Sequence, residues 1–403
     1  MNNIDPSATA SESGASSSPG FIPLSVPSIQ GNEWKYIKEC LDTNWVSSVG
    51  SYVDRFERAI ADYVGADYAI ATTNGTAALH IALLVAGIQP DDEVLVSTLS
   101  FIAPANAIRY VGAHPVFMDA EPKHWQIDPQ KVWDFLEKEC KPYNGSLYNK
   151  TTGHRVSAIL PVHILGHPVN IAPIREAAQH YNLVVIEDAA EGLGAKYQGQ
   201  AVGTLGDISC FSFNGNKIVT AGGGGAIVTD NETWAKQAKY LTTQAKDDPV
   251  EYIHHQVGYN YRLTNLQAAM GVAQLEQLDQ YIQIKRNIAN TYTEAINSIT
   301  GISPMPTEAD WAFSTFWLYT VLVNQSQYGI DNRQLMHALS QMGVQTRPLW
   351  QPLHCNPCHQ NALAYYCQQA EHLYRDALSL PCSVGLRASD QRYILQQLSA
   401  FAG

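Results

Sequence analysis

One stretch of the chain, residues 182–229, limits the possible folds and sites more than any other. It opens with the apolar run Leu183–Ile186, which is typical of a buried strand and leads into two acids, the second of which is Asp188. A second strand-like run carries Ser212 and is followed by Lys217 and a row of glycines. Because parallel strands end in the crevice at the carboxyl edge of a sheet, we expect the acid, the hydroxyl and the lysine to meet there.

Such a trio suits pyridoxal 5'-phosphate (PLP). This cofactor needs an amine for its Schiff base, a carboxylate beside its pyridine nitrogen and donors for its phosphate, and Lys217, Asp188 and Ser212 match these needs in that order. A Walker A loop is excluded because Ile218 follows the lysine, and a G-x-G-x-x-G fingerprint fails at Tyr197. A single lysine taken alone is more often a surface lysine in a mobile loop, and it is the surrounding residues that favour the cofactor role for Lys217.

A further phosphate-binding element is predicted earlier in the chain. A short strand at residues 68–72 leads through a turn into a helix that starts near Gly75 and Thr76. The unpaired N–H groups at such a helix start bind phosphate, and they are also found at any ordinary helix N-cap. Gly75 and Thr76 are therefore candidates to hold the cofactor phosphate together with Ser212.

Strand and helix patterns alternate through the first part of the chain, which predicts an α/β fold with a doubly wound, mainly parallel sheet. Residues 141–156 interrupt this alternation and are interpreted as a polar surface insertion. A long helix from about Leu266 to Ser298 is expected to connect two domains. We therefore expect three parts: a disordered tail (1–20), a large PLP-binding domain with an N-terminal arm (21–270), and the linking helix with a small C-terminal α+β domain (271–403).

Composition narrows the partners. A net charge of −12 argues against nucleic acid and anionic membranes as partners, and no apolar run is long enough to span a bilayer. The seven cysteines are odd in number and scattered, and the N-terminus lacks a signal peptide, so a cytoplasmic protein with reduced thiols is expected. Cys355 and Cys358 flanked by histidines suggest zinc, but without a second cysteine pair we expect no metal.

The motifs EDAAEGLGAKYQG and GDISCFSFNGNKIVTAGGGGAIVTDN resemble the DegT/DnrJ/EryC1/StrS family of nucleotide-sugar aminotransferases, from about Ile22 to the C-terminal helix. The resemblance implies the aspartate aminotransferase-like fold (PLP fold type I), glutamate as amino donor and a nucleotide-linked keto sugar as acceptor. The sequence SFNGNK most resembles the LegC-like branch, which aminates C4 of UDP-linked 4-keto-6-deoxy-N-acetylglucosamine. The nucleotide (UDP, dTDP or GDP) and the aminated carbon (C4 or C3) stay open.

The same resemblance assigns roles to individual residues. Phe101 would stack on the pyridine ring, Glu191 would lie near the cofactor oxygen where relatives carry Gln or His, and His163 would lie near the cofactor. Asn260 would reach the phosphate of the neighbouring subunit, which implies a homodimer with active sites at its interface. Candidate substrate contacts are Trp45, Arg262, Arg347, Trp350 and His354.

Two other functions are known for PLP-binding chains, and the sequence argues against both. A PLP-dependent sugar dehydratase of the same fold would replace the lysine with histidine, whereas this chain keeps Lys217. A non-catalytic PLP-binding regulator would normally carry a DNA-binding domain, and no helix-turn-helix or basic segment is evident.

Overall fold

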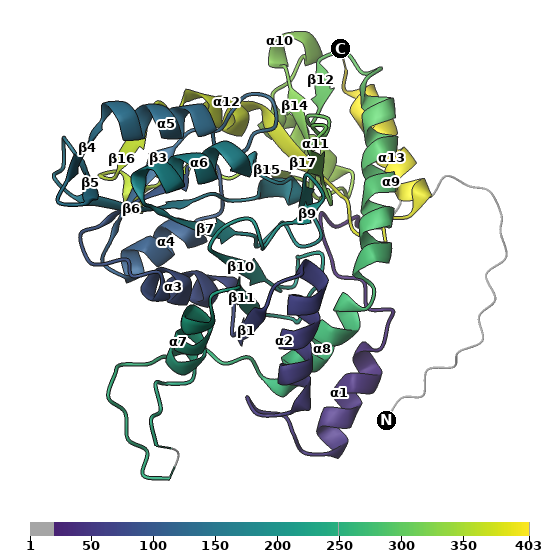
Figure 1. Ribbon diagram of the computed structural model, residues 1–403. Coiled ribbons are helices and arrows are strands. Elements are labelled where there is room, and N and C mark those ends of the chain that lie inside the picture. The colour runs from purple at the N-terminus through teal and green to yellow at the C-terminus, as the bar shows by residue number, and fades with distance from the viewer. Residues whose placement is uncertain (1–19, 249, 403) are drawn as a thin grey trace.

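A twisted central sheet organises the computed structural model, which describes residues 20–248 and 250–402 (Figure 1). Its strand order is β1-β11-β10-β7-β6-β2-β3-β16, and β11 runs antiparallel to both neighbours while the other adjacent pairs are parallel. The predicted α/β fold with a mainly parallel sheet is confirmed. The strands are β1 (Tyr68–Thr72), β2 (Glu93–Ser97), β3 (His114–Met118), β6 (Arg155–Leu160), β7 (Val184–Asp188), β10 (Ile208–Ser212), β11 (Gly225–Thr229) and β16 (Leu363–Tyr365).

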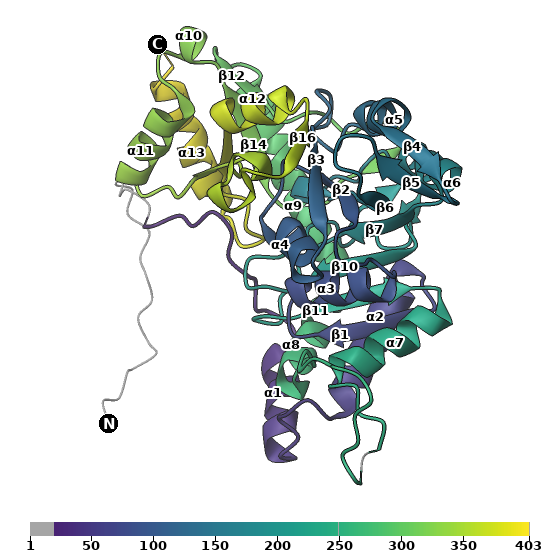
Figure 2. The ribbon, with the colours of Figure 1, turned by 90° about the vertical axis from the view of Figure 1, so that its left-hand side faces the viewer.

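Helices cover both faces of this sheet (Figure 2). Helix α3 (Gly75–Val85) packs on β10 and β11 and against α4 (Ala103–Tyr110) and α7 (Glu232–Thr242). Helix α5 (Pro129–Lys138) packs against α6 (Ile171–Tyr181), which contacts β6 and β7. The chain moves from β2 to β3 and then returns to place β6 on the other side of β2, with all three strands parallel. Because parallel crossovers are right-handed, this reversal of strand order moves the helices from one face of the sheet to the other.

The predicted surface insertion forms a hairpin. Strands β4 (Cys140–Tyr143) and β5 (Ser146–Asn149) pair antiparallel, and β5 extends the sheet beside β6. The hairpin is anchored by Asn149, whose side-chain amide donates to the Glu93 carboxylate over 2.9 Å. The polar hairpin is thus fixed on the sheet because its Asn149 provides a hydrogen-bond donor for the buried Glu93 carboxylate.

The single long helix predicted from Leu266 to Ser298 is wrong. The structure has two helices, α8 (Asn265–Leu275) and α9 (Leu278–Ile296). Between them Gln277 N–H bonds the carbonyl of Gln274 over 3.0 Å, a tighter turn than in an α-helix. Glu276 at this turn is bound by Arg55 and Tyr36 from α2 (Ser51–Val64) and α1 (Glu33–Asp42), and these contacts fix the change of direction.

The last part of the chain builds an antiparallel sheet in the order β12-β14-β17-β15, and it also supplies β16 to the large sheet. The predicted boundary after residue 270 falls inside α8, and the division into domains stays a prediction. Of the expected tail, residues 1–19 lie outside the described residues. No helix within the described ranges is long and apolar enough to cross a bilayer.

The remaining elements are β8 (Lys196–Tyr197), β9 (Gln200–Ala201), β12 (Ile302–Pro304), β13 (Ala312–Phe313), β14 (Tyr319–Val323), α10 (Gln325–Tyr328), α11 (Asn332–Gln341), β15 (Arg347–Pro348), α12 (Gln368–Asp376), β17 (Ala377–Leu380) and α13 (Ala388–Ala400), with short 3-10 turns at Ile164–Gly166, Leu353–Cys355 and Pro357–His359.

Candidate active site

A cavity of about 360 Å³ opens where the carboxyl ends of β1, β2, β7 and β10 meet. Segments far apart in the sequence line it, including the start of α3, the turn after β2 and part of the C-terminal region. The sequence-predicted residues in its wall are Gly75, Thr76, Phe101, Asp188, Glu191, Ser212, Lys217 and Trp350.

Asp188 ends β7 and is 3% exposed. Its carboxylate accepts a hydrogen bond from Ala190 N–H over 3.1 Å. Burial raises the pKa of Asp188, and the nearby charge of Lys217 opposes that rise. A buried carboxylate with so few donors attracts a cation or an N–H group that enters the cavity.

Lys217 follows β10 on a tight turn, in which its own N–H bonds the carbonyl of Asn214 over 3.0 Å. Its Nζ lies 3.4 Å from Glu191 Oε1 and 4.1 Å from the ring centroid of Trp317. Glu191 also accepts from Leu165 N–H over 2.9 Å, and burial raises the pKa of this carboxyl group. The amine therefore lies beside Glu191 and near enough to Asp188 to affect its pKa, and all three residues line the cavity.

The start of α3 forms an anion cradle on the other side of the cavity. Asn74 caps the helix by accepting from Ala77 N–H over 2.8 Å, and the first-turn residues Gly75 and Thr76 have no helical acceptor for their N–H groups. A Cβ atom on Gly75 would come within 2.9 Å of the Ser212 Cβ, so glycine is required where helix and strand meet. N–H groups, a hydroxyl, an amine and a buried carboxylate around one cavity fit the phosphate, aldehyde and ring nitrogen of PLP.

Comparison with known proteins agrees with this geometry. The profile of the DegT/DnrJ/EryC1/StrS aminotransferase family matches residues 27–399. A GDP-perosamine synthase from Caulobacter vibrioides is 39% identical over 369 residues, which cover 92% of this chain and 95% of the relative. The chain belongs to the DegT/DnrJ/EryC1/StrS aminotransferase family.

Solved structures extend the match to the whole fold. A DegT/DnrJ/EryC1/StrS aminotransferase from Brucella abortus superimposes with a TM-score of 0.83 at 25% identity, over 92% of this chain and 95% of that one. The PLP form of Spr1654 from Streptococcus pneumoniae gives a TM-score of 0.84 at 21% identity, over 95% and 98% of the two chains, and this match supports the fold alone. The protein is thus a PLP-dependent sugar aminotransferase, as the sequence predicted, with the fold of that class.

Five of the predicted site residues of this aminotransferase lie outside the cavity wall. Asn260 is exposed on the segment that pairs with Thr243, and Arg262 pairs with Thr72 beside the start of α3. Trp45 is 55% exposed and its carbonyl accepts from Asn265, near the start of α8. Their predicted roles stay predictions. The other two are Arg347, exposed on β15, and His354, whose Nδ1 lies 2.7 Å from Thr98 Oγ1.

Trp317 is the residue that sequence reasoning missed. It lies in the apolar run FWLYTVLVN, whose pattern is typical of a strand, and β14 begins only after it. Its indole forms part of the cavity wall and stands over the Lys217 amine. No motif in the sequence marks this residue, because the contact depends on how the C-terminal part packs on the large sheet.

Beneath the aminotransferase cavity, Glu187 forms a buried support for Asp188. Burial by itself would raise the pKa of Glu187, yet donors from His163 Nε2 at 2.9 Å, Ser209 Oγ at 2.6 Å and Gly206 N–H at 2.7 Å hold it below its ordinary value. The backbone N–H of His163 in turn bonds the carbonyl of Asp188 over 3.0 Å. His163 therefore lies one layer below the cavity and fixes the strand end that carries Asp188.

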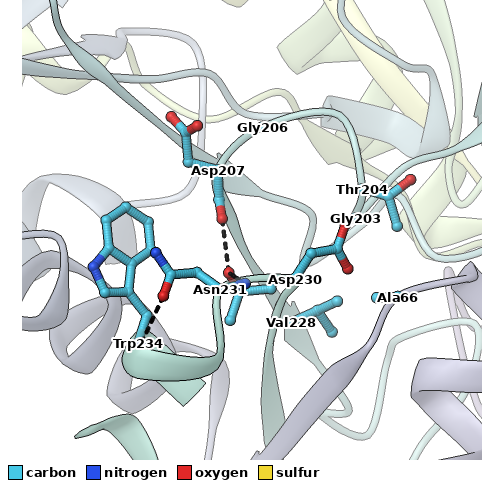
Figure 3. A pocket seen from close by; sticks show the side chains of 10 residues that line it. Ala66, Gly203, Thr204, Gly206, Asp207, Val228, Asp230, Asn231 and Trp234 are labelled. Carbon is cyan, nitrogen blue, oxygen red and sulfur yellow. Dashed lines mark hydrogen bonds between the residues drawn. The ribbon is translucent and has the colours of Figure 1, made fainter. Parts of the chain in front are cut away.

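Another cavity, of about 390 Å³, lies at the opposite edge of the sheet, where β10 begins and β11 ends (Figure 3). Asp207 and Asp230 are among its walls together with Asn231 and Trp234. Both acids already bind backbone N–H groups, Asp207 that of Val185 and Asp230 that of Asp67. These acids hold neighbouring strands and loops in place, so this cavity has a structural explanation.

Two groups of side chains have metal-ligand chemistry. His354, Cys355 and Glu371 present ligand atoms within 4.8 Å of one another, and so do Asp91, His114 and His154. In the first group the side chains already bind one another, because His354 Nε2 forms a hydrogen bond with Glu371 over 3.1 Å. The CxxC pair singled out in the sequence does not come together as one ligand set, because Cys358 belongs to neither group.

His167 gives a prediction for the pH dependence of stability. Burial lowers the pKa of its imidazole from 6.5 to about 4, and its Nε2 is buried without a hydrogen-bond partner in the described structure. The unfolded chain gains this proton below pH 6.5 and the folded one only near pH 4, so acidification in that window destabilises the fold. Between pH 7 and pH 4.5 this residue should cost roughly 2 kcal/mol of unfolding free energy.

Urea unfolding of His167→Phe should therefore lose roughly 2 kcal/mol less than the wild type over that pH change. The exposed His337 serves as control, and His337→Phe should keep the wild-type dependence. If the unfolding free energies of wild type and His167→Phe depended equally on pH, the His167 imidazole would be protonated as easily in the folded protein as in the unfolded chain, and the prediction would be wrong.

Proposed function

We propose that this aminotransferase moves an amino group from glutamate to the keto carbon of a nucleotide-linked 4-keto-6-deoxy sugar. The observation that carries the proposal is the cavity in which Lys217, Asp188, Glu191 and the start of α3 converge on one PLP-sized space. The family membership supplies the reaction class. The position of the cavity at the carboxyl edge of the sheet leaves its mouth open to a bulky acceptor.

Two lines of support point to different nucleotides. The GDP-perosamine synthases of Caulobacter vibrioides and Escherichia coli O157:H7 are both 39% identical to the chain, and this favours a GDP-linked sugar. The SFNGNK motif around Lys217 resembles the LegC-like branch and favours UDP-4-keto-6-deoxy-N-acetylglucosamine. The identity extends over the whole chain whereas the motif is short, so we rank the GDP-linked sugar first and the UDP-linked sugar second, with amination at C4 in both.

PLP, when bound, supplies an electron sink that lets the amino group pass through the cofactor. Lys217 would hold the cofactor, and its freed amine would move a proton at the reacting carbon. Asp188 would favour a protonated ring nitrogen, because a buried anion favours a neighbouring positive charge. Phe101, 57% exposed in the cavity wall, offers a flat face on which the ring can stack.

Glu191 and the start of α3 orient the cofactor from two sides. Gly75, Thr76 and Ser212 would donate to the phosphate, and the buried Glu191 would lie beside the cofactor oxygen near Lys217. The acidic chain also needs local cations for the sugar-linked diphosphate, and Arg262 and Arg347 are the candidates.

The function is tested by incubating PLP-loaded protein and glutamate with GDP-, UDP- and dTDP-linked 4-keto and 3-keto sugars and reading the products by mass. We expect a single amino product, formed fastest from the GDP- or UDP-linked 4-keto sugar. Lys217→Ala should lose both product and visible cofactor absorbance, because the described residues that line the cavity include no other lysine. A Lys217→Ala protein that still aminates, or a wild type that aminates none of the sugars, would refute the proposal.

The second part of the proposal is a homodimer with shared active sites. Asn260 is exposed, pairs with Thr243 and is not among the residues that line the cavity of its own subunit. It follows the segment between α7 and α8 that extends from the body of the protein (Figure 1). Apolar side chains are exposed on that segment and on the N-terminal helices, as expected for a surface that a second copy covers. They include Trp34, Trp45, Tyr252 and Val257, which are 78%, 55%, 67% and 82% exposed.

Complementation between two inactive variants tests the shared site. Lys217→Ala removes the amine from one subunit, and Asn260→Ala removes the expected phosphate contact that the other subunit provides. Mixed dimers then regain one complete site, so co-refolded protein should recover roughly a quarter of wild-type activity if exchange is random. Activity no higher than the sum of the two variants would place Asn260 in its own subunit's site or outside any site.

A further inference from the structure

Trp317 contacts both the reactive amine and the turn that carries it. Its ring centroid lies 4.1 Å from Lys217 Nζ, and its Nε1–H donates to the carbonyl of Asn216 over 2.8 Å. The indole is 3% exposed although it forms part of the cavity wall. Ser25 of the N-terminal arm donates to the same carbonyl over 3.1 Å, so the arm and the C-terminal part both hold the Lys217 turn.

The backbone around Trp317 is held in an unusual conformation. Phe316, directly before it, has φ of 49°, and Leu165 on the facing turn has φ of 61°. A Cβ atom on Gly166 would lie 2.6 Å from Trp317 N, so only glycine admits this approach. Thr315 N–H bonds the carbonyl of Gly166 over 2.9 Å. Such strain persists only where surrounding contacts enforce it, and it concentrates at functional sites.

The same facing turn also holds the second neighbour of the amine, because Leu165 N–H donates to Glu191 Oε2 over 2.9 Å. One contact between two loops therefore sets the positions of both Trp317 and Glu191 relative to Lys217.

A buried lysine fixes the carbonyl of Trp317 from below. Lys285 of α9 is 3% exposed, and its Nζ donates to Trp317 O over 3.0 Å and to Cys382 O over 2.7 Å. A buried ammonium is costly unless it is fully hydrogen-bonded, so these two carbonyls become tightly linked to α9. Trp317 is consequently fixed at two points: Lys285 binds its backbone carbonyl, and its indole N–H binds the carbonyl of Asn216.

We infer that Trp317 is a positioning residue for Lys217, whose ammonium rests on the indole face whenever the amine is not joined to PLP. The inference rests on the proposed function, in which Lys217 is released and used again in every turnover. The negative face of an indole attracts an ammonium group, most strongly where water is excluded. Glu191 and Asp188 are the charged groups that face the amine from the other side, and both attract it as well. Trp317, Glu191 and Asp188 together keep the free amine of Lys217 in the cavity wall, close to where the cofactor would bind.

The test follows the attachment of PLP to cofactor-free protein as a function of pH, read as the growth of visible absorbance. Only the neutral amine attacks the aldehyde, and the indole stabilises the ammonium. Trp317→Leu should therefore move the midpoint of the rate–pH profile down by roughly 0.5 to 1 pH unit. Trp317→Phe keeps an aromatic face and should retain most of the wild-type midpoint. The titration of PLP itself is common to all variants and cancels in the comparison.

Two controls separate this role from a merely structural one. Tyr374→Leu removes another cation–π contact, 4.6 Å from the Arg333 guanidinium carbon, and should leave the midpoint unchanged. Uniform 5-fluorotryptophan weakens the ring's negative face without changing its shape. It should lower the midpoint in the wild type but not in Trp317→Phe, and it decides the matter if Trp317→Leu fails to fold.

Borohydride reduction and peptide mass mapping accompany each profile. The inference is supported if the label is on Lys217 in every variant and the midpoint of the rate–pH profile is lowered in Trp317→Leu or in the fluorinated protein. If the label is on Lys217 but the midpoint is unchanged in both Trp317→Leu and the fluorinated protein, the inference is overturned while the proposed function stands. A wild-type protein labelled on another lysine overturns the proposed function and this inference with it.

Discussion

The structure depends on a buried carboxylate at the end of a central strand. Asp188 is taken out of water by β7 and its neighbours, and burial raises its pKa while Lys217 opposes the rise. Such a group costs free energy until a cation or N–H donor reaches it. Glu187 and His163 hold this strand end in place. In the proposed function, the ring nitrogen of PLP would be the group that reaches Asp188 and offsets this cost. The remaining cofactor contacts are arranged around this fixed point.

The second requirement is that distant parts of the chain close the site. The large sheet supplies Asp188, Glu191, Ser212 and the start of α3 to one cavity wall, and in the proposed function these residues would hold PLP. The C-terminal part adds Trp317 and Trp350 to the same cavity wall. Lys285 and Gly166 show how this addition is fixed, one by a buried ammonium and the other by the absence of a side chain. We therefore propose that residues at the strand ends hold the cofactor, whereas residues from the C-terminal part position the Lys217 amine.

Much of the site was predictable from sequence because its residues follow strand ends. An apolar run that stops at Asp188, and another that leads to Lys217, place both groups at one edge by the rules of parallel sheets alone. The start of α3 follows the same rule, with Gly75 required by the approach of Ser212. Trp317 obeys no such rule, because its position depends on a left-handed Phe316 and on loop contacts across the chain. The turn between α8 and α9 was missed for the same reason: Glu276 bends the path through side chains from α1 and α2 that no local periodicity reveals.

The most direct measurement of the central claim is the ¹⁵N NMR shift of the ring nitrogen in protein loaded with ¹⁵N-labelled PLP. If Asp188 rests against that nitrogen, the wild type should show it protonated at neutral pH, and Asp188→Asn should show it unprotonated. The same ring-nitrogen shift in the two proteins would contradict the account, because the buried carboxylate would then have another purpose.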